Sequence, residues 1–294
     1  MTRSVLIIGA GELGLALIDS FTTHPSKSSV SVLLRPSSKT DLSSYPVKIV
    51  HGDISLQSSD FSYLLKGFDI VILATGFSAG PGTQLRVAQA VLEAKVPHYI
   101  PWQYGVDYDV IGRGSSQPLF DEQLDVRDLL RSQEDANGKT SWTIISTGMF
   151  TDTLFGPALG IVDLKNGVVH ALEKWDNRLT VTSSEDIGYL TARIALNQED
   201  IPQGVIFIAG DTVNFADIAK EVERAGWKIN RKVISIEDLE RRLKLDPDDL
   251  GAKYGLIWAR NKGVSWPVED SWNGKNGMKT ETIKEWIEKH LPKP

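Results

Sequence analysis

Ser4–Gly14, with the sequence SVLIIGAGELG, is the stretch from which the fold of this chain is predicted. Its first five residues, SVLII, are apolar and rich in strand-forming side chains, as in a buried β-strand. The strand is followed directly by Gly9, Gly11 and Gly14, which match the pattern G-x-G-x-x-G. Such a pattern after a strand, at the start of a helix predicted over Leu13–Phe21, is typical of the first turn in a strand–helix–strand unit.

Short β-rich runs alternate with helical segments through the first half of the chain. Further strands are predicted at Val30–Leu34, Val47–Val50, Ile70–Ala74, His98–Ile100 and Trp142–Ser146. Further helices are predicted at Phe61–Lys66, Thr83–Ala94 and 118–131, and a polar loop at 133–140. Repeated strand–helix–strand units imply a parallel sheet with helices on both faces. The expected fold class is therefore α/β, a Rossmann-type doubly wound parallel sheet.

The pattern becomes less regular beyond about residue 150. It indicates helices at Glu185–Leu196, Asn214–Ala225, Ile236–Leu243 and Thr280–His290, a strand at Val205–Ala209, and a loop-rich segment at 254–274. We therefore expect two domains. The first, 1–150, carries the parallel sheet, and the second, 151–294, is a smaller mixed region from which segments at about 180–210 return to the first.

The composition excludes several classes of function. The 294 residues are 41% hydrophobic and 24% charged, as in an ordinary soluble globular protein. The net charge of −6 argues against a nucleic-acid partner, which needs clustered Lys and Arg. The chain has no cysteine, which excludes disulfides, thiolate catalysis and Cys-ligated zinc. Apolar runs are too short for a signal peptide or a transmembrane helix, so we expect a cytoplasmic protein with no membrane partner.

The glycine loop predicts a dinucleotide cofactor. Gly9 permits the tight turn, Gly11 lets the backbone approach a pyrophosphate, and Gly14 lets the helix pack against the strand. The backbone N–H groups of Glu12 and Leu13, where the helix starts, are expected to face the phosphates. A glycine-rich turn with packing duties alone is the alternative.

The turn after the second predicted strand indicates which dinucleotide binds. In NAD-binding folds an acidic residue near this position holds the ribose 2′-hydroxyl. Here the strand is followed by Arg35, Ser37, Ser38 and Lys39. A guanidinium, two hydroxyls and an ammonium suit a 2′-phosphate, so the sequence favours NADP(H). A solvated basic turn is the alternative.

Two further strand ends should face the same ligand, because ligands of such sheets bind beyond the carboxyl ends of the strands. Asp53 follows the third predicted strand and is expected beside the adenine. Thr75, Gly76 and Phe77 follow the fourth and are expected along the ribose and pyrophosphate. Each of these residues is equally suited to forming a turn.

With these features the chain resembles the NmrA-like and isoflavone-reductase-like branch of the atypical short-chain dehydrogenases, and most of all the fungal isoflavone-reductase-like proteins. The resemblance rests on the glycine loop, the Arg35 turn, EDIG at 185–188, and VPHYIPWQYG at 96–105, which is similar to the family's RFLPSEFG. It implies an NADP-binding Rossmann domain and a C-terminal region that binds a small-molecule substrate. It also implies cofactor contacts from Gln103 and from Phe150, which lies in the loop after the sixth predicted strand.

Two departures from the family pattern affect the predicted chemistry. Members usually carry G-x-x-G-x-x-G, one residue longer than the loop here, and a catalytic lysine in a helix similar to FEVKAKVRR. Matching Phe120 and Arg127 to that helix places Gln123 at the position of the lysine. A glutamine cannot donate a proton, although its amide can hydrogen-bond a carbonyl or the nicotinamide ribose. Gln123 also lies among the apolar residues of the predicted amphipathic helix, as an inward-facing amide would.

Tyr104 and His170 are the candidates to replace the lysine in catalysis. Tyr104 lies at the substrate-facing end of a predicted strand, where the family usually has phenylalanine, and packing of its ring is the alternative role. His170 lies in the region where this family builds its substrate pocket. No acidic pair has the spacing of a metal site, so no metal is expected.

The aromatic residues favour an apolar substrate. Trp102, Phe155 and the tryptophans at 258, 266 and 272 could line a pocket for a flat ligand, although aromatic side chains are more often core residues. The leading hypothesis is an NADP-dependent oxidoreductase of secondary metabolism that reduces a carbonyl, imine or enone of an aromatic or apolar small molecule. The alternatives are a redox-silent NmrA-type NADP-binding sensor and an NADP-binding enzyme of non-redox isomerisation or cyclisation. The sequence leaves the oligomeric state open.

Overall fold

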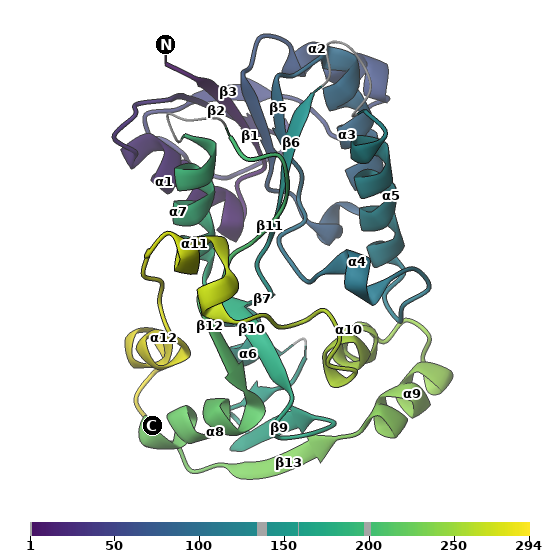
Figure 1. The fold of residues 1–294 in the computed structure, drawn as a ribbon, viewed down its shortest axis with the longest axis vertical. Coiled ribbons are helices and arrows are strands. Elements are labelled where there is room, and N and C mark those ends of the chain that lie inside the picture. The colour runs from purple at the N-terminus through teal and green to yellow at the C-terminus, as the bar shows by residue number, and fades with distance from the viewer. Residues whose placement is uncertain (1, 134–139, 158, 197–200) are drawn as a thin grey trace. The chain divides into compact units, whose positions relative to one another are not determined.

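The central feature of the computed structural model, which describes residues 2–133, 140–157, 159–196 and 201–294, is a seven-stranded parallel sheet (Figure 1). Its strands are β1 (Ser4–Ile8), β2 (Ser29–Leu34), β3 (Lys48–His51), β4 (Ile70–Leu73), β5 (His98–Ile100), β6 (Ser141–Ser146) and β11 (Gly204–Phe207). They are ordered β11-β6-β5-β4-β1-β2-β3. The chain thus extends the sheet from β1 first in one direction and then in the other, as in a doubly wound fold. The expected Rossmann-type α/β fold is confirmed.

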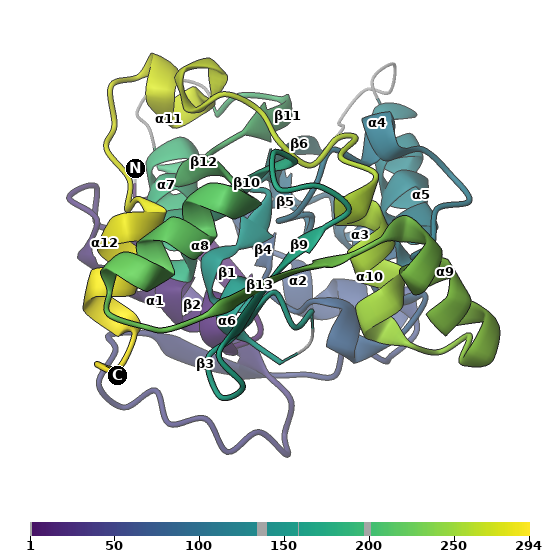
Figure 2. The same cartoon turned by 90° about the horizontal axis from the view of Figure 1, so that it is seen from below.

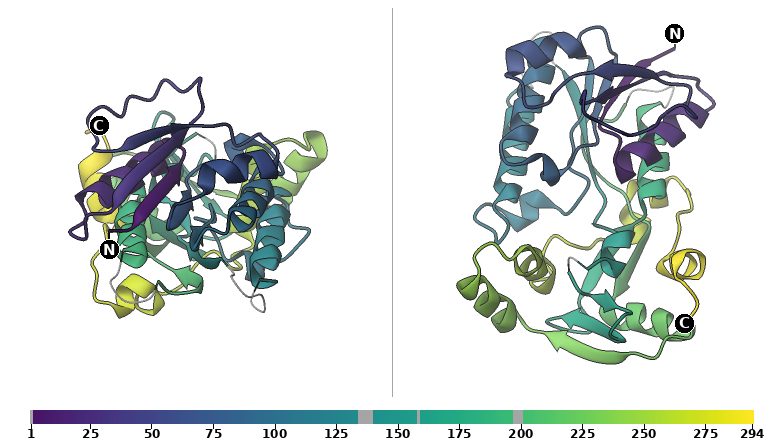
Figure 3. Two further views of the ribbon diagram at one scale, coloured as in Figure 1. Left: turned by 90° about the horizontal axis from the view of Figure 1, so that it is seen from above. Right: turned by 180° about the vertical axis from the view of Figure 1, so that it is seen from behind.

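Helices cover both faces of this sheet (Figures 1 and 3). On one face lie α1 (Glu12–Thr23) and α7 (Ser184–Ala195), and on the other lie α2 (Ser58–Leu65), α3 (Thr83–Ala94) and α5 (Leu119–Arg131). A Cβ added at Gly188 would lie only 2.5 Å from the carbonyl oxygen of Ala16. The close packing of α7 against α1 therefore depends on a residue without a side chain.

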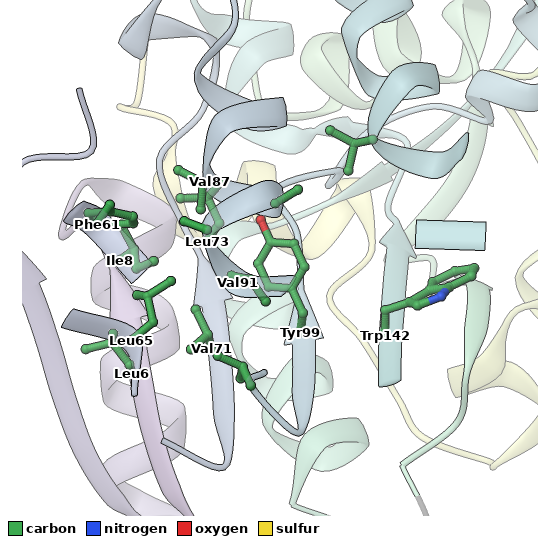
Figure 4. Close-up of a cluster of buried hydrophobic side chains, with 14 of the residues drawn as sticks. Leu6, Ile8, Phe61, Leu65, Val71, Leu73, Val87, Val91, Tyr99 and Trp142 are labelled. Carbon is green, nitrogen blue, oxygen red and sulfur yellow. The ribbon is translucent and has the colours of Figure 1, made fainter. Parts of the chain in front are cut away.

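An apolar core fills the space between the sheet and α2, α3 and α5 (Figure 4). β4 has the sequence IVIL and is buried throughout, as expected of a central parallel strand covered on both faces. Tyr99 of β5 and Trp142 of β6 belong to the same cluster as Val126 and Leu130 of α5. Because such interiors are close-packed, the core fixes the strands, and with them the positions of the residues at the strand ends.

The remaining elements form a smaller mixed region, seen from below in Figure 2. One three-stranded sheet consists of β7 (Met149–Phe150), β10 (Arg178–Thr182) and β12 (Asp211–Asn214), with β10 in the middle. Another consists of β8 (Val162–Asp163), β9 (Val168–Leu172) and β13 (Asn230–Ile234), with β9 in the middle. The helices here are α4 (Tyr108–Ile111), α6 (Thr151–Phe155), α8 (Phe215–Arg224), α9 (Ile236–Leu245), α10 (Leu250–Ala259), α11 (Trp272–Lys275) and α12 (Ile283–His290).

The prediction of a loop-rich segment at 254–274 is wrong at both ends of that range, where the structure has helices. α10 continues to Ala259, and α11 begins at Trp272. In α10 the six residues Ala252, Gly255, Leu256, Ile257, Trp258 and Ala259 are all buried. A helix buried on most sides shows no polar stripe, so the helical period is hard to recognise in its sequence.

The described residues divide into two compact units, and the chain enters each of them more than once. Unit 1 comprises Met1–Tyr104, Asp121–Ile145 and Ile187–Ile206; unit 2 comprises Gly105–Phe120, Ser146–Asp186 and Phe207–Pro294. The domain division at residue 150 stays a prediction. Most of the loop expected at 133–140 lies outside the described residues. None of the described helices is both long and apolar enough to cross a membrane.

Candidate functional site

A cleft of about 350 Å³ lies at the carboxyl ends of β1, β2 and β4 in unit 1. In a doubly wound sheet this is the edge at which ligands bind, next to the point where the strand order reverses. Its lining consists of Ile8, Gly9, Ala10, Gly11, Leu33, Leu34, Arg35, Ser38, Thr40, Ile54, Ala74, Thr75, Gly76, Ser78 and Ala79. The structure therefore brings six of the sequence-predicted cofactor residues together: Gly9, Gly11, Arg35, Ser38, Thr75 and Gly76.

The three glycines of the loop have different surroundings. Gly9 has a φ of +100°, and a Cβ there would lie 2.4 Å from Oγ1 of Thr75. A Cβ on Gly14 would lie 2.4 Å from the carbonyl oxygen of Gly9. Around a Cβ built on Gly11, by contrast, no described atom lies within 4 Å. Gly9 and Gly14 thus shape the loop, while Gly11 leaves open space beside the cleft, where a ligand can approach the backbone.

α1 begins directly after Gly11, with Glu12 and Leu13 in its first turn. Gly11 is the N-cap, and no side chain there accepts hydrogen bonds from the first N–H groups. The helix therefore presents backbone donors and the positive end of its dipole, a combination that binds phosphate groups. The Leu13 side chain is buried, the Glu12 side chain is exposed, and neither residue lines the cleft. What these two residues can offer a ligand is their backbone N–H groups.

The turn after β2 presents only some of its polar residues to the cleft. The Ser38 N–H donates to the carbonyl oxygen of Arg35 at 2.9 Å and closes the turn. Arg35, Ser38 and Thr40 line the cleft, whereas Ser37 and Lys39 do not. The Ser38 hydroxyl donates to Oγ1 of Thr40 at 3.2 Å. One arginine and two hydroxyl-bearing residues of this turn therefore line the cleft.

Asp53 lies after β3, next to the cleft-lining residue Ile54 but outside the lining itself. Its carboxylate accepts a hydrogen bond from the Ser55 N–H at 2.9 Å. Hydrogen bonds from Ser55 lower the pKa of Asp53, and the charge of Arg35 lowers it further. Asp53 is thus a carboxylate at neutral pH within the electrostatic reach of Arg35.

The segment after β4 forms the wall of the cleft opposite the basic turn. The Thr75 hydroxyl donates to the carbonyl oxygen of Ile8 at 3.1 Å, which ties this wall to β1. A Cβ on Gly76 would lie 2.8 Å from the ring of Trp102, so the ring reaches the backbone only because the residue is glycine. Phe77 packs edge-on against Trp102, with ring centroids 4.6 Å apart, and does not line the cleft.

Gln103, Gln123 and Arg127 form a fully buried polar group in unit 1. The Gln103 amide donates to the backbone carbonyl of Gln123 at 2.9 Å, and its Oε1 accepts from Nε of Arg127 at 2.8 Å. Gln103 thus holds α5, and it does not line the cleft. Neither the nitrogen nor the oxygen of the Gln123 side-chain amide has a hydrogen-bond partner among the described residues. A buried amide without partners costs free energy that a bound ligand can recover.

The other predicted catalytic and cofactor residues have different surroundings. Tyr104, in unit 1, is buried, and burial raises the pKa of its hydroxyl. His170 lies in β9 of unit 2, where its Nδ1 is 2.8 Å from the carbonyl oxygen of Gly160. Phe150 belongs to β7 of unit 2, opposite Thr182 of β10. Neither His170 nor Phe150 lines the cleft of unit 1.

The aromatic residues proposed for a substrate pocket have packing partners. Phe155 stacks on Trp286, with ring centroids 4.5 Å apart. Trp266 packs edge-on against Phe207 and donates its ring N–H to the carbonyl oxygen of Ile208 at 3.0 Å. Trp258 is buried in α10. These contacts agree with the ordinary core role of aromatic side chains.

Nine residues of the cleft lining were not predicted as site residues. Five of them, Ile8, Ala10, Leu33, Leu34 and Ala74, belong to the predicted strands or to the glycine loop, and the other four, Thr40, Ile54, Ser78 and Ala79, lie in the loops after the strands. Each of these four lies within a few residues of a predicted position, on the same strand-end segment. The signal that could have found them is the strand-end rule itself, applied several residues further into each loop.

The comparisons with known proteins agree with this fold. A protein of Gibberella moniliformis, named NmrA-like family domain-containing oxidoreductase, is 37% identical over 302 residues, which cover 98% of each chain. The structure of AtPrR2 with NADP⁺ and (+)pinoresinol has a TM-score of 0.80 at 16% identity and covers 98% of each chain. The structure of an isoflavone reductase has a TM-score of 0.78 at 17% identity and covers 99% of this chain and 100% of the other. At these identities the two structures show a shared fold.

The family model and the Gibberella relative decide the family. The model described as the NmrA-like family matches residues 1–254, which is most of the 294-residue chain. Together with the isoflavone-reductase fold, this match confirms the resemblance expected from the glycine loop and the Arg35 turn. The chain therefore belongs to the NmrA-like family.

Proposed function

We propose that the protein is an NADP(H)-dependent oxidoreductase that reduces a carbonyl, imine or enone of an aromatic or apolar small molecule. One observation carries the proposal. A single cleft is lined both by Gly11, which has open space beside it and caps the N-terminus of α1, and by residues of the Arg35–Thr40 turn. The first pair suits a pyrophosphate, and the turn suits a 2′-phosphate. The name of the Gibberella relative, an oxidoreductase, and the NADP⁺ and (+)pinoresinol held by AtPrR2 support the same class of activity.

Different residues of the cleft would bind different parts of NADP(H). Gly11 and the first N–H groups of α1 would hold the pyrophosphate, and Gly9 would shape the loop beside it. Arg35, with the Ser38 and Thr40 hydroxyls, would hold the 2′-phosphate. NADPH, when bound, supplies a hydride, and the protein contributes binding and orientation.

Gln123 defines what the protein can contribute to proton transfer. Its amide cannot act as a general acid, but its Nε2 can donate to a carbonyl and its Oε1 can accept from a hydroxyl of the nicotinamide ribose, and two such bonds would satisfy its buried, unpartnered atoms. The Tyr104 hydroxyl, whose pKa is raised by burial, keeps its proton at neutral pH and is a weak acid. The proton would therefore come from Tyr104 or from water.

Cofactor binding and turnover test this proposal directly. The purified protein is titrated with NADPH, NADP⁺ and NADH, and NADPH consumption is followed with a panel of aromatic ketones, imines and enones. We expect NADPH to bind more tightly than NADH and to be consumed with at least one class of acceptor. Consumption of NADH and NADPH with equal efficiency would contradict the choice of cofactor.

Arg35→Ala, with Lys39→Ala as its matched control, tests the 2′-phosphate site. Both variants remove one positive charge from the same exposed turn, but only Arg35 lines the cleft. Loss of a charge-assisted contact to phosphate should raise the Kd for NADPH by roughly 10- to 100-fold. The Kd for NADH should stay unchanged in Arg35→Ala, and both Kd values should stay unchanged in Lys39→Ala. Equal weakening of NADPH by the two variants would mean that the turn acts only through its net charge.

A redox-silent NADP-binding sensor is the second candidate function. Gln123 favours it, because a non-ionisable amide occupies the position that the resemblance gives to the catalytic lysine. Equal affinity for NADPH and NADP⁺, with no turnover on any acceptor, would support the sensor and contradict the oxidoreductase.

A further inference from the structure

The wall of the cleft after β4 contains a single short 3₁₀ helix, η1 (Phe77–Ala79), with glycines on both sides of it. Residues 75–82 read TGFSAGPG and contain three glycines, two of which have positive φ: Gly80 at +87° and Gly82 at +76°. Glycine gives a chain more conformational freedom than any other residue. The same segment nevertheless supplies Thr75, Gly76, Ser78 and Ala79 to the lining of the cleft. Besides the backbone hydrogen bonds of η1, contacts with other elements hold this segment in place.

The first turn of α3 provides two of these contacts. The Gln84 side-chain amide donates to the carbonyl oxygen of Thr75 at 3.0 Å. The Thr83 hydroxyl donates to the carbonyl oxygen of Ala79 at 3.0 Å. Both ends of the cleft-lining stretch are thus hydrogen-bonded to α3, so the position of this turn contributes to the position of the wall, together with the bond from Thr75 to Ile8 and the packing of Trp102.

A side chain of α5 in turn holds the first turn of α3. The N-cap, Gly82, has no side chain with which to cap the helix. Glu122 supplies a carboxylate instead: its Oε2 accepts from the Gly82 N–H at 2.9 Å, and its Oε1 accepts from the Leu85 N–H at 3.1 Å. An anion at this end of a helix also interacts favourably with the helix dipole.

We propose that Glu122 is a positioning residue for the dinucleotide cleft, acting through the first turn of α3 on the wall at residues 75–79. This inference rests on the proposed cofactor for its effect on binding, but the mechanical connection runs through hydrogen bonds within unit 1 alone. Because Glu122 precedes Gln123 on α5, one helical turn both anchors the cleft wall and carries the buried amide.

Glu122→Ala, Glu122→Gln and a matched control at the other end of α3 test the proposal. The control is Glu93→Ala, because Glu93 accepts a hydrogen bond from the Ser58 hydroxyl at 2.8 Å, far along α3 from the cleft wall. Amide hydrogen exchange is measured across residues 75–85 in the free protein, and NADPH affinity is measured by titration.

We expect faster exchange over 75–85 and a roughly tenfold higher Kd for NADPH in Glu122→Ala, since two charge-assisted hydrogen bonds are lost. Glu122→Gln keeps one acceptor oxygen and should recover part of both losses. Glu93→Ala should change neither, even where its melting temperature falls.

Two results would overturn the inference. One is a Glu122→Ala protein with a lower melting temperature but wild-type exchange over 75–85 and wild-type affinity, which would make Glu122 a purely stabilising residue. The other is an equal loss of affinity in Glu93→Ala. Failure of the wild-type protein to bind NADPH would instead overturn the proposed cofactor, and the exchange measurement would then decide the role of Glu122 by itself.

Discussion

Gly11 caps α1 and Gly14 lies in its first turn, three residues later, but a methyl group added at each would have different surroundings. At Gly14 it would lie 2.4 Å from a backbone oxygen, and at Gly11 it meets no described atom within 4 Å. We expect Gly14→Ala to lower the free energy of unfolding by about 1–3 kcal/mol, as overpacking does. Gly11→Ala should lower it by only about 0.5–1 kcal/mol, since alanine is a poorer N-cap than glycine, while strongly weakening NADPH binding.

Urea unfolding and NADPH titration of both variants check this prediction. The two effects should separate, with stability lost at Gly14 and affinity lost at Gly11. A Gly11→Ala protein that binds NADPH as the wild type does would show that the pyrophosphate does not approach this backbone. A Gly14→Ala protein of unchanged stability would show that α1 can shift away from the loop without cost.

The Arg35 turn shows how far single residues of the site could be predicted. Sequence chemistry identified the turn as basic and hydroxyl-rich, and Arg35 and Ser38 do line the cleft. It also predicted Ser37 and Lys39, which do not line the cleft, and it missed Thr40, because the residues that face the cleft depend on the hydrogen bond that closes the turn. For Gln123 the helical period did predict burial, since the residue lies on the apolar face. The absence of any partner for its amide could be seen only in three dimensions.

At the scale of elements, predictions succeeded where a local pattern was strong. The strands of the central sheet are short apolar runs between turns, and each was placed to within one or two residues. The helix predicted from Asn214 is also found, and Asn214 is its N-cap, with a side chain that accepts from the Asp217 N–H at 2.8 Å. β13 has the mostly exposed sequence NRKVI, without apolar alternation, and was missed. Its place is determined by its pairing with β9, which is a long-range contact.

His98 makes β5 sensitive to pH. The residue is buried, its Nε2 lies 3.0 Å from Oγ1 of Thr143 in β6, and burial, aided by the charge of Arg3, lowers its pKa from 6.5 to about 4. The unfolded chain therefore takes up a proton at a higher pH than the folded chain does. His98 therefore contributes to the free energy of unfolding in full above about pH 6.5. This contribution is lost as the pH falls to about 4, and the total loss is up to about 3 kcal/mol.

Urea unfolding of the wild type and of His98→Gln, at several pH values between the two pKa values, isolates this effect. Glutamine retains a hydrogen-bonding group but does not titrate. The stability of the wild type relative to the variant should decrease steadily as the pH falls. A difference that is independent of pH would mean that His98 ionises in the folded protein as easily as in the unfolded chain.

At the scale of the whole molecule, stretches that are far apart in the sequence combine to form one compact unit. Unit 1 is built from three separate stretches, because 187–206 returns to it after the chain has entered unit 2. These residues supply most of α7 and β11, and β11 pairs with β6 at one end of the sheet. Ile187, Leu190 and Ile194 of α7 are fully buried. The sequence indicated a return at about 180–210, but only the contacts show how much of the unit depends on it.

A fragment that ends at residue 150 should therefore not fold cooperatively, although it contains β1 to β6. It lacks the three buried side chains of α7, each worth about 1.5–3 kcal/mol, so the loss is roughly 5–9 kcal/mol. That loss is comparable with the total stability of a typical domain, about 5–15 kcal/mol. Without β11, β6 also becomes an exposed edge strand, which favours aggregation.

The matched control is the same fragment joined through a flexible linker to residues 184–208, which restores both elements. We expect a sharp urea transition for the linked protein and a broad one, or aggregation, for the fragment. A sharp transition for residues 1–150 alone would mean that the first six strands and their helices hold the sheet without the returning segment.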